Sequence, residues 1–181
     1  MRKLFIFIAV LLMSCERSPQ LKFREAMGDG NAPLEPLGTN ESFAIGMASN
    51  AKGASSLTLE FRPNGIIVVE SRNPTGKLVK TEKIQLSGSQ VSALRMRIAA
   101  FRPPARNEVF LPRGCTYAYD DSDTVTLVFE NVADDTKDVD RIRFVHFQDT
   151  CRSRWAELGL TEIRAIMASL PQTALIRSRV L

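Results

Sequence analysis

The stretch LTLEFRPNGIIVV, residues 57–69, decides the fold. From Leu57 to Phe61, apolar and polar residues alternate, and a period of two is typical of a strand with one buried face. Asn64-Gly65 then favours a tight turn, because both residues tolerate positive φ. The β-branched run of residues 66–69 predicts a second strand, so we expect this stretch to form a β-hairpin.

Alternating stretches on both sides of this hairpin extend the sheet. Upstream, apolar residues alternate from Phe43 to Met47, and downstream Asn73-Pro74-Thr75-Gly76 forms a second turn before a strand from Leu78 to Leu86. Together these stretches predict an antiparallel meander of three or four strands. The second half of the chain repeats the pattern, with alternation at residues 117–119, 124–129 and 141–147.

A helix is predicted between the two sets of strands. Ser87 and Gln90 have the spacing of a capping box, and Pro103-Pro104 stops the helix. Its apolar stripe consists of Val91, Leu94, Ile98 and Phe101. Its arginines, Arg95, Arg97 and Arg102, lie off this stripe, where we expect a solvated face, with a docking surface as the alternative.

A second helix is predicted from Arg152 to Leu170, with Asp149 or Thr150 as its N-cap, a possible interruption at Gly159 and an end at Pro171. Its buried side is expected to comprise Trp155, Ile163, Ile166, Met167 and Leu170. The tail, Thr173 to Leu181, either adds an edge strand or frays.

These elements predict an α+β fold, in which two helices lie on one face of an antiparallel sheet of about six or seven strands. We expect residues 42–181 to form this single domain. Residues 15–41 contain scattered Pro and Gly without periodicity, which is typical of a tether that is mostly disordered.

The N-terminal segment has the pattern of an export signal. Arg2 and Lys3 precede an apolar run at residues 4–12, which is too short to span a bilayer as a helix. The following Leu12-Met13-Ser14-Cys15 resembles the lipobox of bacterial lipoproteins, with Met13 departing from the commoner small or β-branched residue. The resemblance implies that residues 1–14 are removed and that Cys15 carries the lipid that attaches the chain to the membrane. Glu16 in place of Asp favours the outer membrane over the inner, with the domain facing the periplasm.

The number of cysteines fits this interpretation. With Cys15 modified by lipid, Cys115 and Cys151 remain, and a pair of cysteines in an exported protein predicts a disulfide. Two free buried thiols are the alternative. The disulfide would connect the second helix to the edge of the sheet.

The charge excludes one class of partner. Without Arg2 and Lys3, 22 basic residues face 20 acidic residues, so the mature chain is nearly neutral. No cluster of Lys and Arg is long enough for nucleic-acid binding.

The sequence contains no recognisable catalytic motif, and we assign no catalytic residue, metal or cofactor. His146 is the single histidine, and its position in a strand pattern favours a structural, hydrogen-bonded side chain over a catalytic base. One histidine cannot provide a zinc site. The acidic stretches at residues 120–123 and 134–140 are typical of solvated turns, with Ca²⁺ binding as the alternative for the first.

We therefore expect a non-enzymatic lipoprotein whose domain contacts a protein or a cell-wall partner through polar loops. The alternatives are a hydrolase using carboxylates from residues 120–140 and a structural lipoprotein for outer-membrane assembly. The candidate contact residues are Arg106, Arg113, Asp120, Asp121, Asp123, Arg177 and Arg179.

Overall fold

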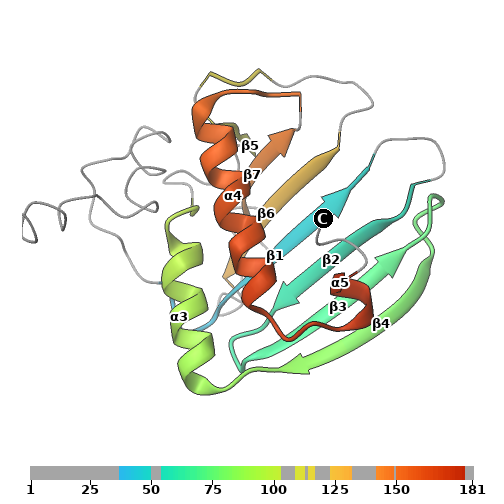
Figure 1. The fold of residues 1–181 in the computed structure, drawn as a ribbon. Coiled ribbons are helices and arrows are strands. Elements are labelled where there is room, and N and C mark those ends of the chain that lie inside the picture. The colour runs from blue at the N-terminus through green and yellow to red at the C-terminus, as the bar shows by residue number, and fades with distance from the viewer. Residues whose placement is uncertain are drawn as a thin grey trace, which may run out of the picture.

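The computed structural model describes residues 37–49, 54–102, 109–112, 114–116, 123–131, 142–148 and 150–177. Within these residues one seven-stranded sheet has the order β4-β3-β2-β1-β6-β7-β5 (Figure 1). Its strands are β1 (Glu41–Ala48), β2 (Ser56–Phe61), β3 (Ile66–Arg72), β4 (Leu78–Gln85), β5 (Val109–Phe110), β6 (Thr124–Asn131) and β7 (Ile142–Gln148). All neighbouring strands are antiparallel except β5 and β7, which are parallel. The predicted α+β class is confirmed.

The predicted hairpin is the β2–β3 pair. Arg62 N donates to Ile66 O at 2.9 Å, and Gly65 N donates to Arg62 O at 3.0 Å. The Asn64 side chain accepts from Ile66 N at 3.1 Å. Gly65 has a φ of 82°, in the left-handed region that the Asn-Gly pair predicts.

We expect Gly65→Ala to lower the free energy of unfolding by about 1–2 kcal/mol, because alanine resists this φ and its Cβ would lie 2.9 Å from Val91 Cγ2. Gly76→Ala is the matched control, since Gly76 has a similar φ of 78° but a Cβ there would meet nothing within 4 Å. Urea unfolding of both variants measures the difference. An equal loss of unfolding free energy in the two variants would show that the close approach to Val91 does not contribute to the effect of Gly65→Ala.

β1 joins the two halves of the chain. Phe43 lies opposite Phe61 of β2 and Phe129 of β6. The Phe43 ring stacks on the Phe61 ring with 4.3 Å between centroids. The three rings lie in the core, because each is at most 3% exposed. The strand pattern therefore places alternate residues of β1, β2 and β6 under the helices.

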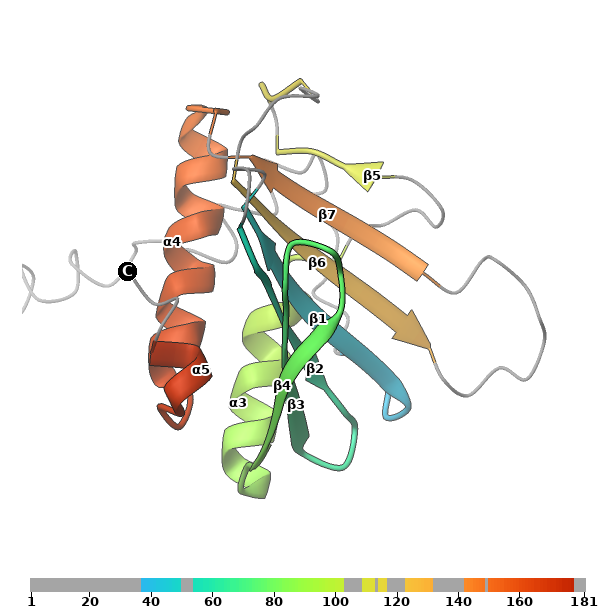
Figure 2. The ribbon, with the colours of Figure 1, turned by 90° about the vertical axis from the view of Figure 1, so that its right-hand side faces the viewer.

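Both long helices cover the same face of the sheet (Figure 2). In α3 (Gly88–Ala99), Ser87 and Gln90 form the predicted capping box, with Ser87 N donating to Gln90 Oε1 at 2.9 Å. Just beyond α3, the buried Phe101 ring packs edge-on against Phe147 of β7, at 6.2 Å between centroids. The predicted apolar stripe of α3 thus reaches the core on the β7 side of the sheet.

The second long helix, α4, spans Arg154–Ser169, and its predicted N-cap at Thr150 is wrong. Ser153 caps the helix, with its side chain accepting from Ala156 N at 3.1 Å. Cys151 N donates to Gln148 O, so the chain turns here before the helix begins. Asp149 lies outside the described residues. Gly159 is buried within an unbroken helix, so it does not interrupt α4.

The described part of the C-terminal tail, residues 173–177, differs from both predicted forms, and residues 178–181 lie outside the described residues. Residues Ala174–Arg177 form the short helix α5, whose Ile176 side chain is fully buried. Thr173 Oγ1 accepts from Ile176 N at 3.3 Å. The burial of one apolar side chain and this cap favour a helical turn over an edge strand.

Candidate functional site

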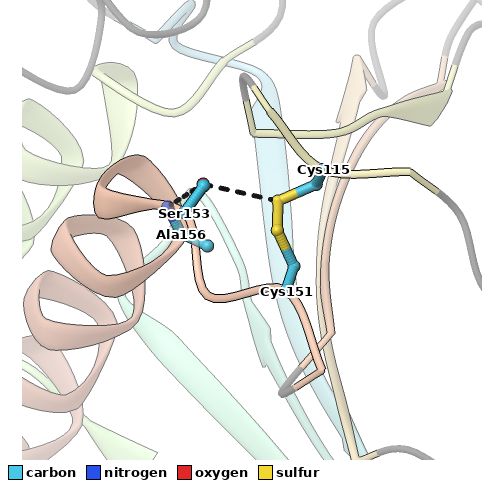
Figure 3. Close-up of a disulfide and its surroundings, with 4 residues drawn as sticks. All are labelled: Cys115, Cys151, Ser153 and Ala156. Carbon is cyan, nitrogen blue, oxygen red and sulfur yellow. Dashed lines mark hydrogen bonds between the residues drawn. A yellow bond between two sulfur atoms is a disulfide. The ribbon is translucent and has the colours of Figure 1, made fainter.

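The disulfide between Cys115 and Cys151 is present, as the sequence predicts. Its Cα atoms lie 5.5 Å apart, and it joins the segment after β5 to the segment before α4 (Figure 3). Ser153 Oγ lies 3.5 Å from Cys115 Sγ while it also caps α4. The disulfide therefore fixes the start of α4 beside the β5–β7 edge of the sheet.

A hollow of about 440 Å³ adjoins this disulfide. Both cysteines are half-buried, and the polar residues around them are exposed or half-exposed. Besides the two cysteines, the hollow is lined by Gly114, Thr116, Thr150, Arg152 and Ser153. Its lining can offer hydroxyl, backbone and guanidinium donors.

Asp123 is the predicted contact residue that lies at the same end of the sheet. It is exposed and immediately precedes β6, whose first residue, Thr124, pairs with Gln148 at the end of β7. Arg177 is also exposed, but it lies in α5, which contacts β3 near the opposite edge. The structure therefore does not bring these two residues together. The other predicted contact residues, Arg106, Arg113, Asp120, Asp121 and Arg179, lie outside the described residues.

The lining residues other than the cysteines were not predicted from the sequence. The nearest available signal was the N-cap preference, because serine is a stronger cap than threonine and would have placed the helix start at Ser153. Gly114 and Thr116 are distant in sequence from Thr150 and Arg152, and no local pattern predicts that the disulfide brings them together.

The three arginines of the first helix do not form the predicted solvated face. Arg97 Nε donates to Glu162 Oε1 of α4 at 2.7 Å and so connects the two long helices. Arg95 donates to the backbone carbonyl of Glu41 at 2.9 Å, and also to that of Gly38. Arg102 donates to the Glu41 carboxylate at 2.7 Å. All three arginines are thus partly buried structural contacts.

Glu41, the first residue of β1, accepts several of the hydrogen bonds that hold the start of this strand. Its carboxylate accepts from Gly38 N at 3.0 Å as well as from Arg102, and the residue is 8% exposed. Leu37, four residues earlier, is already part of the core. The first described residues are therefore fixed to α3 and its C-terminal extension.

His146 lies in a strand and is hydrogen-bonded, as its position in the sequence predicts. Its Nδ1 lies 2.8 Å from Thr126 Oγ1 across the β6–β7 pair. The two side chains lie on the sheet face opposite the helices, because β6 residues Val125 and Leu127 point towards the core. Partial burial disfavours the charged imidazolium and lowers the pKa of His146.

We expect the single histidine resonance in an NMR titration to have its midpoint below pH 6.5. Since the unfolded chain then binds this proton at a higher pH than the folded chain, stability is lost as the pH falls below about 6.5. Urea unfolding midpoints are measured above and below pH 6.5. The midpoint should fall less at the lower pH for His146→Gln than for the parent. A titration midpoint at or above that of a model imidazole would contradict the prediction.

Convergent acids are not seen among the described residues. Asp123 and Glu130 stand at opposite ends of β6 and both are exposed. The described residues contain no group of three or more His, Cys, Asp or Glu that could hold a metal ion. The second acidic stretch, residues 134–140, lies outside them. In the same part of the chain, no helix combines the length and apolar character needed to cross a membrane.

Comparison with models of known protein families and with curated protein sequences gives no match to this chain.

Proposed function

We propose that this chain is a bacterial envelope lipoprotein, attached to a membrane through lipid on Cys15, whose α+β domain acts as a non-enzymatic binding or accessory module in the periplasm. The observation that carries the proposal is the lipobox-like Leu12-Met13-Ser14-Cys15 after a short charged and apolar leader. The outer membrane is the favoured location, because Glu16 replaces the aspartate associated with retention in the inner membrane.

The disulfide supports an exported location. Disulfides persist in the periplasm and are rare in the reducing cytosol. Because Cys115 and Cys151 bond to each other, Cys15 is the one cysteine of the sequence left for another use. Lipidation of Cys15 gives each cysteine a chemical role.

The position of the first described residue is compatible with this attachment. Leu37 is held in the core, and 22 residues separate it from Cys15 along the chain. A segment of that length reaches about 75 Å at most, so the domain can contact partners well beyond the membrane surface.

Mass spectrometry of the chain expressed with its own leader in a Gram-negative host tests the attachment. Trypsin should release Cys15-Glu16-Arg17 carrying a diacylglyceryl group, and Cys15→Ala should remove both the modification and the membrane association. A mature chain that lacks lipid on Cys15 would overturn the proposal.

We propose the hollow beside the disulfide as the partner-contact surface. Exposed polar residues meet there on a covalently fixed scaffold, which is the usual arrangement of recognition loops. Asp123 lies at the same end of the sheet and would belong to this surface, whereas Arg177 would not.

Photo-crosslinking in intact cells tests this surface. A photoreactive residue at Thr116 or Thr150 should give a defined adduct with an envelope protein or with cell-wall glycan. Arg164, which is exposed on α4 about 15 Å from the start of that helix, is the matched control and should give none. Adducts from Arg164 but not from Thr116 or Thr150 would overturn the assignment.

A further inference from the structure

The outer edge of β4 is a surface that the proposed function does not use. Within the described residues β4 pairs with β3 alone, so its other side has no strand beside it (Figure 1). Leu78 is 44% exposed and Val79 is 66% exposed. A long edge strand with exposed apolar side chains is a ready template for pairing with another strand.

The hydrogen bonds to β3 show which backbone groups of β4 face outwards. Leu86 N donates to Gly65 O at 3.0 Å, directly across the pair. In an antiparallel ladder the residues that exchange these bonds alternate, so Ile84 and Glu82 also direct their backbone groups to β3. Thr81 and Lys83 therefore direct theirs to the open edge. Because Ser71 pairs with Lys80 and Arg72 with Leu78, Val79 is left outside the ladder, and the regular segment of β4 begins at Lys80.

The charges of β4 limit the registers in which a second β4 could pair with this edge. A two-fold axis places the residue on the axis opposite itself in the second copy. Lys80, Glu82 and Lys83 would each oppose a like charge in that position, which is destabilising. Among residues 80–83, only Thr81 is uncharged. A Thr–Thr pair on the axis is favourable in sheets.

Placing the axis at Thr81 makes the flanking charges complementary. Lys80 then lies opposite Glu82 of the second copy, and Glu82 lies opposite Lys80 of the second copy. The outward-facing backbone of Thr81 makes the central pair a hydrogen-bonded one, so each Lys–Glu pair is of the more closely spaced type. Within one chain Lys80 Nζ already binds Glu82 Oε1 at 2.7 Å. The hydrogen bond from Lys80, followed by that from Thr173, lowers the pKa of Glu82.

We propose that two copies of this chain associate through antiparallel β4–β4 pairing about a two-fold axis at Thr81, with reciprocal Lys80–Glu82 ion pairs. The sheet would then continue from one copy into the other. The helices of both copies would lie on the same face of the combined sheet, because Lys80 and Glu82 share the helix-covered side with the buried Ile84.

Disulfide crosslinking tests the register. In the full-length chain with Cys15→Ser, single Thr81→Cys, Lys80→Cys, Glu82→Cys and Lys83→Cys variants are oxidised and resolved without reductant. Thr81→Cys should form a covalent dimer, because paired Cα atoms lie about 5.5 Å apart, within disulfide range. Lys83→Cys places its Cα atoms about 14 Å apart and should not crosslink. Strongest crosslinking at any position other than 81 would overturn the register.

Charge reversal tests the ion pairs without a new thiol. Lys80→Glu and Glu82→Lys should each weaken dimerisation about tenfold or more in sedimentation equilibrium, since like charges then oppose each other. An equimolar mixture of these two variants should restore association, because each supplies the charges that the other lacks. Circular dichroism checks that both variants fold. A parent chain that stays monomeric up to about 1 mM, with no Thr81→Cys dimer, would overturn the proposal.

Discussion

Replacing both Cys115 and Cys151 with alanine is expected to lower the free energy of unfolding by about 4 kcal/mol. The disulfide closes a separation of 36 residues, so the unfolded chain without it gains many conformations. In the folded state the variant also loses the covalent bond between the β5–β7 edge and the start of α4. Urea unfolding of the parent and of the double variant measures the difference.

Two controls separate the disulfide from its surroundings. Reductant should destabilise the parent and leave the double alanine variant unchanged. Ser153→Ala keeps the disulfide but removes the N-cap of α4, and is expected to cost about 1 kcal/mol. A double alanine variant that loses no more than Ser153→Ala would show that the crosslink contributes little beyond its local contacts.

Sequence patterns predicted the local parts of the fold because their causes are local. Alternation at Phe43 to Met47 and Leu57 to Phe61 reports one buried face, and the Asn64-Gly65 turn needs only its own φ values. The capping box of Ser87 and Gln90 likewise lies within four residues. Such signals require no knowledge of the rest of the chain.

Long-range pairings are what sequence patterns could not supply. β1 pairs with β6 although more than 70 residues separate them, and no feature of either strand's sequence identifies the other as its partner. β5 has only two residues, too few for a period to appear. The spacing of the first helix's arginines predicts a solvent-exposed face. Arg102 nevertheless forms an ion pair with Glu41, which lies 61 residues away in the sequence.

The candidate site was only partly predictable for the same reason. The disulfide followed from a count of cysteines and the compartment that the leader implies. The hollow beside it depends on where Gly114 to Thr116 and Thr150 to Ser153 meet in space, which the count does not give. Asp123 joins this end because β6 begins where β7 ends.

Arg102→Ala is expected to lower the free energy of unfolding by about 3 kcal/mol, because it leaves a buried carboxylate without its ion-pair partner. The side chains of Arg102 and Glu41 are 13% and 10% exposed, and their polar atoms lie 2.7 Å apart. Arg62→Ala is the matched control. The Arg62–Glu60 pair is nearly as short, at 2.8 Å, but its side chains are 46% and 45% exposed. Exposed pairs contribute less than about 1 kcal/mol.

A double-mutant cycle isolates the pair itself. Glu41→Gln keeps an acceptor for Gly38 N and removes the charge, so the loss from Arg102→Ala should be smaller in that background by at least about 1 kcal/mol. Equal losses from Arg102→Ala and Arg62→Ala would contradict the role of burial. Arg95 still donates to the Glu41 carbonyl in the Arg102→Ala variant, so the start of β1 should loosen rather than detach. Amide hydrogen exchange should therefore rise first at residues 41–43, while the amides of Leu127 and Phe129 in β6 stay protected.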